Sequence, residues 1–245
     1  MLLSLDHASK RFGSLKVIDD LSFALAEGEA LGVLGPNGAG KSTMFNLVTG
    51  DLRPDAGRVV YREADVTELA PSERCRRGIG RSYQIPHPFG GMTVFENVLA
   101  ACVFGGTLRA DAADAHAVTV LERTGLIAKA NKLAGSLTLL DRKRLELARA
   151  LGTRPRLLLL DEIAGGLTDH EAQALVETIQ AIRGEGVSLI WIEHVVHALL
   201  KVVDRLIVIN FGKLLKEGPP ADVMASREVR EVYMGIEADL AGVAQ

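Results

Sequence analysis

Short, almost wholly apolar runs alternate with amphipathic stretches in the second half of the chain. Three such runs lie at 157–161, 187–193 and 206–210. Strands that are buried on both faces of a parallel sheet show this pattern. The intervening segments, 169–183 and 195–203, carry apolar residues at helical spacing. This order predicts an α/β fold with a mainly parallel sheet, whose functional residues lie at the carboxyl ends of the strands.

The first 35 residues have a different pattern. Apolar stretches at 2–8, 22–25 and 29–34 are separated by turn residues rather than by helices. We expect an antiparallel β subdomain near the N-terminus, whereas the strand at 29–34, which leads into a helix, is half of a βαβ unit. A helix is predicted at 42–48 and ends at Gly50, because glycine is the usual residue after a helix.

The middle of the chain predicts helices. Prolines and glycines cluster at 86–91, and capping boxes at Thr93 and Thr138 then open helical patterns. We expect a helical insertion at 85–154. The core domain would comprise 1–84 and 155–235, and 236–245 would form a C-terminal tail.

Composition narrows the class of protein. With 28 Lys and Arg against 31 Asp and Glu, the net charge is −3, so no general attraction to nucleic acid is expected. The two cysteines have no metal-ligand or disulfide spacing, which fits a reducing cytoplasm. The N-terminus lacks the pattern of a secretory signal, and the apolar runs are far short of the ~20 residues that span a bilayer. A role at a membrane would therefore need another chain.

A P-loop lies between a predicted strand and a predicted helix. The motif GxxxxGK[ST] is matched by Gly35, Pro36, Asn37, Gly38, Ala39, Gly40, Lys41 and Ser42, and Thr43 follows it. Glycines let the backbone N–H groups wrap a triphosphate, and the helix N-terminus adds partial positive charge. Lys41 would neutralise phosphate oxygens and Ser42 would bind Mg²⁺. The sequence predicts an ATP site rather than a glycine-rich turn.

Two carboxylates follow the apolar run at 157–160. Asp161 would hold Mg²⁺, and Glu162 would polarise the attacking water. An acidic pair after a strand is also a common start of a loop. Its place downstream of a P-loop favours the catalytic interpretation.

The P-loop, the acidic pair and several other segments resemble those of ABC-type ATPases, and the resemblance covers nearly the whole chain. Phe12 takes the place of the aromatic residue that stacks on adenine, although an apolar residue in a turn is the competing interpretation. Gln84 resembles the glutamine that senses Mg²⁺ and links the core to the helical insertion. His194 resembles the histidine that contacts the γ-phosphate. The segment 165–168 occupies the place of the D-loop, which contacts the opposite subunit.

The family signature is altered. The resemblance implies that it opens the helix before the second catalytic strand, where this chain has Leu137, Thr138, Leu139, Leu140 and Asp141. In the family this segment caps the ATP of the partner subunit. Leu140 replaces a glycine, so either its side chain turns onto its own helix and the N–H still reaches phosphate, or it blocks closure. We favour the first. Ile163 also departs from the usual proline.

Several segments together resemble the ATP-binding subunits of bacterial branched-chain amino-acid uptake systems. They are 81–86, 91–98, 141–149 and 218–223. The resemblance implies an ATPase on the inner face of the cell membrane, in a homo- or heterodimer beneath membrane-spanning permease subunits, with a periplasmic solute-binding protein supplying the solute. A soluble ABC-type ATPase without a permease and a subunit with weak hydrolysis are the alternatives. No guanine-recognition motif of a GTPase occurs.

Overall fold

The computed structural model describes residues 1–232, which group into two compact units. Unit 1 consists of 1–69 together with the described residues from Val203 onward, and unit 2 is Ala70–Val202. These units do not follow the boundaries at 84 and 154 that the sequence suggests. The expected division into a core and a helical insertion stays a prediction, and the expected tail at 236–245 lies outside the described residues.

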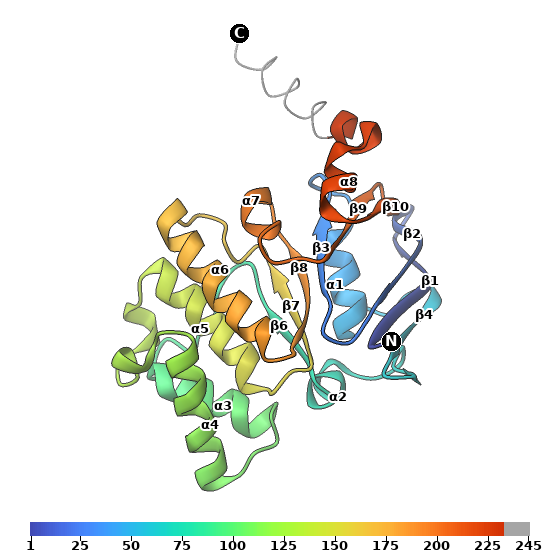
Figure 1. The fold of residues 1–245 in the computed structure, drawn as a ribbon. Helices are drawn as coiled ribbons and strands as arrows, with labels where there is room; N and C mark the ends of the chain where they lie inside the picture. Colours follow the sequence, from blue (N-terminus) through green and yellow to red (C-terminus); the bar gives the residue numbers. More distant parts are fainter. Residues whose placement is uncertain (233–245) are drawn as a thin grey trace. The chain divides into compact units, whose positions relative to one another are not determined.

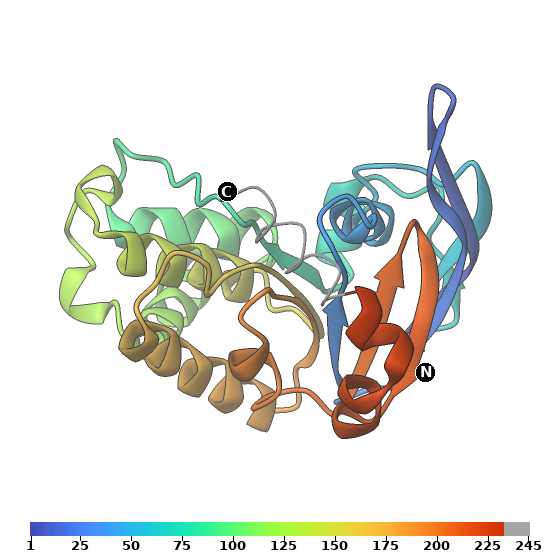
Figure 2. The same cartoon turned by 90° about the horizontal axis from the view of Figure 1, so that it is seen from above.

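Unit 1 contains the antiparallel sheet expected near the N-terminus. Its strands, in spatial order, are β2 (Leu15–Leu25), β1 (Leu3–Phe12), β4 (Ala56–Tyr61) and β5 (Ala64–Asp65). Every pair is antiparallel. The strands β1 and β2 are longer than expected, and they extend as a ribbon whose tip projects beyond the rest of this sheet (Figure 2).

The P-loop of unit 1 follows a buried strand. This strand, β3 (Ala30–Leu34), is buried at every position and pairs in parallel with β9 (Arg205–Asn210). The strand β10 (Lys213–Gly218), which was not predicted from the sequence, pairs antiparallel with β9. The predicted helix after the P-loop is α1 (Lys41–Thr49), and it ends at Gly50 as expected. Farther along lie α8 (Pro220–Ala225) and helical residues 227–232.

Unit 2 contains three parallel strands. They lie in the order β6 (Ile79–Ser82), β7 (Leu157–Asp161) and β8 (Ser188–Ile192). Every residue of β7 and β8 is buried, which confirms the interpretation of their apolar runs. The connecting helix α6 (Asp169–Gly184) matches its prediction. The helix α7 (Val196–Leu199) is shorter than the predicted 195–203.

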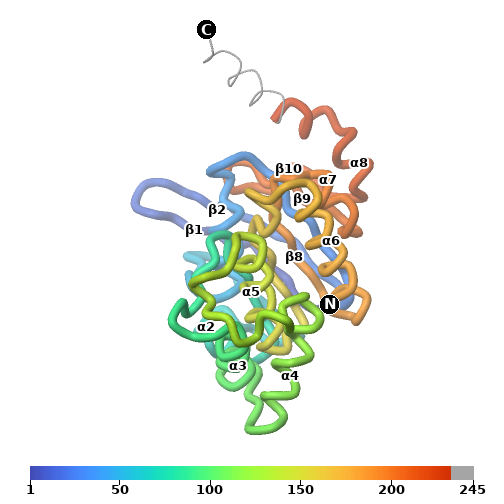
Figure 3. The backbone as a smooth tube through the Cα atoms, turned by 90° about the vertical axis from the view of Figure 1, so that its left-hand side faces the viewer, coloured from blue at the N-terminus to red at the C-terminus, as the bar shows by residue number. Residues whose placement is uncertain are grey.

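The remaining helices of unit 2 form one packed group. After the short α2 (Pro71–Arg76), α3 (Val94–Phe104), α4 (Ala110–Arg123) and α5 (Leu139–Gly152) contact one another (Figures 1 and 3). Two 3₁₀ turns, Ile127–Lys129 and Ala134–Ser136, connect α4 to α5. The predicted capping box at Thr93 is complete, and Thr138 caps α5. Among residues 1–232, no helix has the length and apolar character to cross a membrane.

Candidate functional site

The P-loop backbone adopts conformations that require glycine. Gly35 has φ +153° and Gly40 has φ +103°. A Cβ atom on Gly35 would lie 2.2 Å from the carbonyl oxygen of Ile209, and one on Gly40 would lie 2.8 Å from the carbonyl oxygen of Val17. Both contacts are with rigid backbone, so a side chain at either position would force the loop to move.

Lys41 bends back over the loop that precedes it. Its Nζ atom donates to the carbonyl oxygens of Gly35, at 2.5 Å, and Pro36, at 3.0 Å, and the residue is buried. Ser42 is exposed in the first turn of α1. The N-cap is Gly40, which has no side chain to cap the first-turn N–H groups. The loop therefore presents a cation, a hydroxyl group and backbone donors, the groups that bind a polyphosphate.

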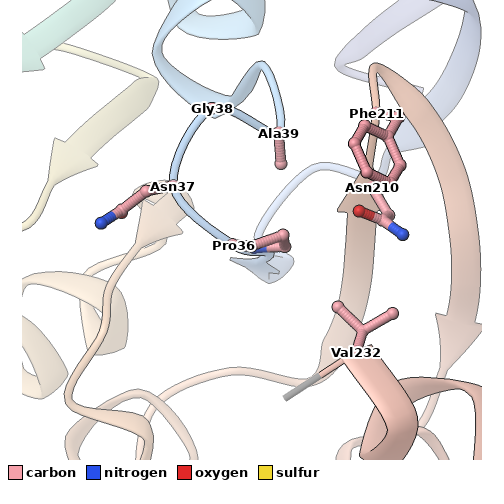
Figure 4. Close-up of a pocket in the computed structure, with 7 residues that line it drawn as sticks. All are labelled: Pro36, Asn37, Gly38, Ala39, Asn210, Phe211 and Val232. Atoms are coloured by element: carbon pink, nitrogen blue, oxygen red, sulfur yellow. The ribbon is translucent and has the colours of Figure 1, made fainter. Parts of the chain in front are cut away.

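The outer side of the P-loop borders a cavity of about 300 Å³. Its lining residues are Pro36, Asn37, Gly38, Ala39, Asn210, Phe211 and Val232 (Figure 4). The side chain of Asn37 points away from the cavity (Figure 4). The carbonyl oxygen of Ala39 accepts from the N–H of Gly212 at 3.0 Å, so the turn between β9 and β10 holds the P-loop by a backbone hydrogen bond beside the cavity.

Phe12 lies at the end of β1, next to the tip of the β1–β2 ribbon. The residue is 48% exposed, which leaves its ring accessible to a base. Asp55 holds the strand beside it, because the carboxylate accepts from Lys10 Nζ at 2.8 Å and from the N–H of Arg11 at 2.7 Å. The hydrogen bond from Lys10 lowers the pKa of Asp55 below its ordinary value.

Unit 2 brings three of the predicted site residues together. Glu162 follows β7 directly, and its carboxylate accepts from Gln84 Nε2 at 2.5 Å and lies 2.7 Å from His194 Nε2. Gln84 follows β6 and His194 follows β8, so each residue comes from a different strand end. Glu162 has φ +46°, a conformation that costs a non-glycine residue on the order of 1 kcal/mol or more. A carboxylate within reach of an imidazole can orient and deprotonate water.

Asp161, the predicted metal ligand, pairs with Arg81 in this structure. The Arg81 Nη2 atom lies 2.9 Å from Asp161 Oδ2, and both side chains are buried. The Arg81 guanidinium also lies over the ring of Tyr83, 4.7 Å from its centroid. The pair neutralises a buried carboxylate, which would otherwise be costly.

The predicted magnesium ligands have the correct chemistry. They offer the hydroxyl of Ser42, the amide oxygen of Gln84 and the carboxylate of Asp161, and Mg²⁺ prefers oxygen ligands. When bound, the ion neutralises charge on the phosphates. Among the described residues, no cluster of three or more His, Cys, Asp or Glu could hold a metal by itself.

The altered signature begins α5. Thr138 accepts from the N–H of Asp141 at 3.3 Å, and the buried Asp141 carboxylate accepts from the Thr138 hydroxyl and from Lys129. Leu137 is buried, whereas Leu139 is 48% exposed. Leu140 is half-buried. This burial fits both interpretations, a side chain turned onto its own helix and a side chain that blocks closure.

Three charged residues around Glu162 and Asp161 were not identified individually from the sequence. They are Arg81, Lys143 and Glu193. Each had a signal: Arg81 lies near the end of a buried strand, Lys143 lies in an amphipathic helix, and Glu193 follows an apolar run as Asp161 does. Sequence alone does not show which residues these side chains contact.

Comparison with known proteins identifies related chains. A family model described as ABC transporter matches residues 18–165, more than half of the chain. The high-affinity branched-chain amino acid transport ATP-binding protein LivG of Salmonella typhimurium is 36% identical, over 96% of this chain and 98% of its own. The lipopolysaccharide export system ATP-binding protein LptB of Haemophilus influenzae is 32% identical, over 96% and 97%.

Solved structures show the same fold. A nucleotide-free ATP-binding cassette from an ABC transporter aligns with a TM-score of 0.88 and 29% identity, covering 95% of this chain and 98% of its own. The ADP conformation of the cassette MJ1267 also aligns with a TM-score of 0.88, at 30% identity, covering 96% and 98%. The expected α/β fold, with its antiparallel β subdomain, is therefore confirmed.

Proposed function

The chain belongs to the ABC transporter family, whose ATP-binding subunits hydrolyse ATP to drive transport, and we propose that it powers the uptake of branched-chain amino acids or a related small solute. The observation that carries this proposal is the similarity to LivG over nearly the full length of both chains. The segments 81–86, 91–98, 141–149 and 218–223 support the same subfamily.

We assign roles to the site residues from their motifs and from their resemblance to ABC-type ATPases. The loop at 35–43 binds the phosphates through its N–H groups and Lys41, and Phe12 stacks on adenine. Ser42, Gln84 and Asp161 are the Mg²⁺ ligands. Glu162 is the general base, with His194 beside it at the γ-phosphate, and their contact supports this pairing. The segment 137–141 would cap the nucleotide of a second subunit.

The proposed partners follow from the proposed transport. The chain would work as a homo- or heterodimer beneath permease subunits, on the cytoplasmic face of the membrane, and a periplasmic binding protein would select the solute. Closure of the dimer around ATP would drive the permease, and hydrolysis would release it. Solute specificity would then lie in the other chains.

Export is the second candidate, because LptB is also similar over nearly its full length. The two candidates predict different phenotypes. We would delete the gene in its host and measure uptake of radiolabelled leucine, isoleucine and valine, with complementation by the parent chain and by Glu162→Gln.

Uptake that falls on deletion and returns only with the parent chain supports import. Unchanged uptake of all three amino acids, together with a loss of lipopolysaccharide from the cell surface, would support export and overturn our proposal. Co-purification of a polytopic permease with the tagged chain distinguishes either transporter from an ABC-type ATPase without a permease.

A further inference from the structure

Lys143 is a buried cation on α5 that points to the main chain of the catalytic segment. Only 4% of the residue is exposed, although lysine is rarely buried. Its Nζ atom donates to the carbonyl oxygen of Glu162 at 3.2 Å. Burial lowers the pKa of Lys143, while the negative charges of Glu193 and Glu162 act in the opposite direction. Burial therefore disfavours the charged ammonium group, and the nearby carboxylates of Glu193 and Glu162 favour it.

Glu193 is a buried anion that organises the two segments after β7 and β8. The residue is 1% exposed. One carboxylate oxygen accepts from the N–H of Ala164 at 2.9 Å, and the other accepts from the N–H groups of His194 at 2.9 Å and Val195 at 3.3 Å. A carboxylate with three backbone donors fixes the chain on both sides of it. Glu193 therefore ties the segment after Glu162 to the segment that carries His194.

Glu162 needs this support because of its backbone conformation. At φ +46° it occupies a region that non-glycine residues rarely adopt, and such a residue is held there by its surroundings. Lys143 holds the carbonyl group of Glu162, and Glu193 holds the N–H group of Ala164, two residues farther on. The contact between Glu162 and His194, at 2.7 Å, depends on the placement of both segments.

We propose that Lys143 and Glu193 are positioning residues, which set the backbone at Glu162 and His194 so that the carboxylate and the imidazole meet at the reacting phosphate. The proposal rests on the proposed role of Glu162 as the general base. Lys143 lies two residues after the signature segment 137–141, on the same helix. The orientation of Glu162 therefore depends on the position of α5, the helix that begins with the signature segment.

The test compares three variants in the full-length chain within its transporter complex. Lys143→Met removes the donor and the charge but keeps an unbranched side chain, Lys143→Arg restores both, and Glu193→Gln removes the negative charge. Lys132→Met is the matched control, because Lys132 is an exposed lysine of the same unit. We would measure kcat and KM for Mg-ATP hydrolysis, equilibrium binding of a fluorescent ATP analogue, and the melting temperature.

We expect kcat to fall on the order of 100-fold in Lys143→Met and about 10-fold in Glu193→Gln, since small displacements of a catalytic group have effects of this size. KM and analogue binding should stay within about threefold of the parent values, because the P-loop is unchanged. Lys143→Arg should recover most of the rate, and Lys132→Met should match the parent.

Other outcomes overturn the proposal. A Lys143→Met variant that folds and hydrolyses ATP at the parent rate would exclude the positioning role while leaving the ATPase assignment intact. If Lys143→Met does not fold, a parent-like kcat in Glu193→Gln would also exclude the positioning role. A folded Lys143→Arg variant with no recovered rate would show that Lys143 acts only through packing. A parent complex without Mg-ATP hydrolysis would instead remove the role of Glu162 on which the proposal rests.

Discussion

The P-loop and the Glu162 cluster, which consists of Glu162, Gln84, His194 and Lys143, are held in place by different kinds of interaction. The P-loop is held mainly by backbone contacts, since backbone carbonyl oxygens of Ile209 and Val17 leave no room for a side chain at Gly35 and Gly40, and Lys41 donates to carbonyl oxygens of the loop. The cluster in unit 2 is held by side chains from separate elements, with Glu162 bonded to groups that follow β6 and β8 and to a lysine of α5.

This difference predicts different responses to mutation. A change in the P-loop acts on the backbone, so stability and nucleotide binding should change together. A change in the cluster removes a single side-chain contact, so hydrolysis should change while binding remains. The predictions for Glu162 and Gly35 below test the two sides of this comparison, and those for Arg81 and Asp55 test ion pairs and hydrogen bonds beside them.

The largest effect is expected for Glu162→Gln. The amide keeps the size of the side chain but cannot accept a proton from water, so kcat should fall on the order of 1,000-fold. Binding of Mg-ATP should remain within a few-fold of the parent value, as measured by equilibrium titration. Glu177→Gln, an exposed substitution on α6, is the control. Hydrolysis at the parent rate in the assembled complex would show that another group is the base.

A smaller effect is expected for Arg81→Met. This change removes one half of a buried ion pair and leaves the Asp161 carboxylate without its guanidinium, so the free energy of unfolding should fall by about 3 kcal/mol. Urea denaturation measures it. The double variant Arg81→Met with Asp161→Asn should recover part of the loss. Purely additive losses in the two single variants would mean that the ion pair does not couple these residues.

Gly35→Ala tests the other side of the comparison. The added Cβ would clash with the carbonyl oxygen of Ile209, so we expect a loss of about 2 kcal/mol in unfolding free energy together with weaker ATP binding. Gly184→Ala is the matched control, because a Cβ there meets no atom within 4 Å and the helical backbone accepts it. Equal urea midpoints for the parent and Gly35→Ala would refute the backbone argument.

The smallest effect is expected from Asp55, which anchors the strand beside Phe12. Its pKa is lowered in the folded state, chiefly by the hydrogen bond from Lys10. Its contribution to stability is therefore fully present above the ordinary pKa of 3.8 and is lost as the pH falls through the folded-state value. Between pH 6 and pH 3, the urea midpoint should fall slightly less in Asp55→Asn than in the parent. An identical fall in both proteins would contradict this role.

The same contrast explains what the sequence could predict. The P-loop is contiguous, so the spacing of its glycines and its flanking elements identified it, and the structure has the expected helix, which begins one residue earlier than predicted, at Lys41. The buried strands β7 and β8 were also readable, because runs of apolar residues are sufficient evidence for them.

The rest required information that one sequence does not contain. Gln84 and His194 were found through resemblance to a family, not through their chemistry. Lys143 and Glu193 were missed because their contacts join segments about 20 or more residues apart, which periodicity does not report. The strand β10 was missed because its sequence, Lys213–Gly218, is half polar and only partly buried. The division of the chain into a core and an insertion stays a prediction.

We infer that the P-loop and Asp161 bind the same Mg-ATP. This inference is tested most directly by titrating the parent chain, Lys41→Ala and Asp161→Asn with ATP, in Mg²⁺ and in EDTA. We expect Lys41→Ala to weaken binding at least about tenfold in both conditions, since it removes a charged donor to phosphate. Asp161→Asn should remove only the gain in affinity that Mg²⁺ gives. A parent chain that does not bind ATP, or an Asp161→Asn chain that keeps the full Mg²⁺ effect, would contradict it.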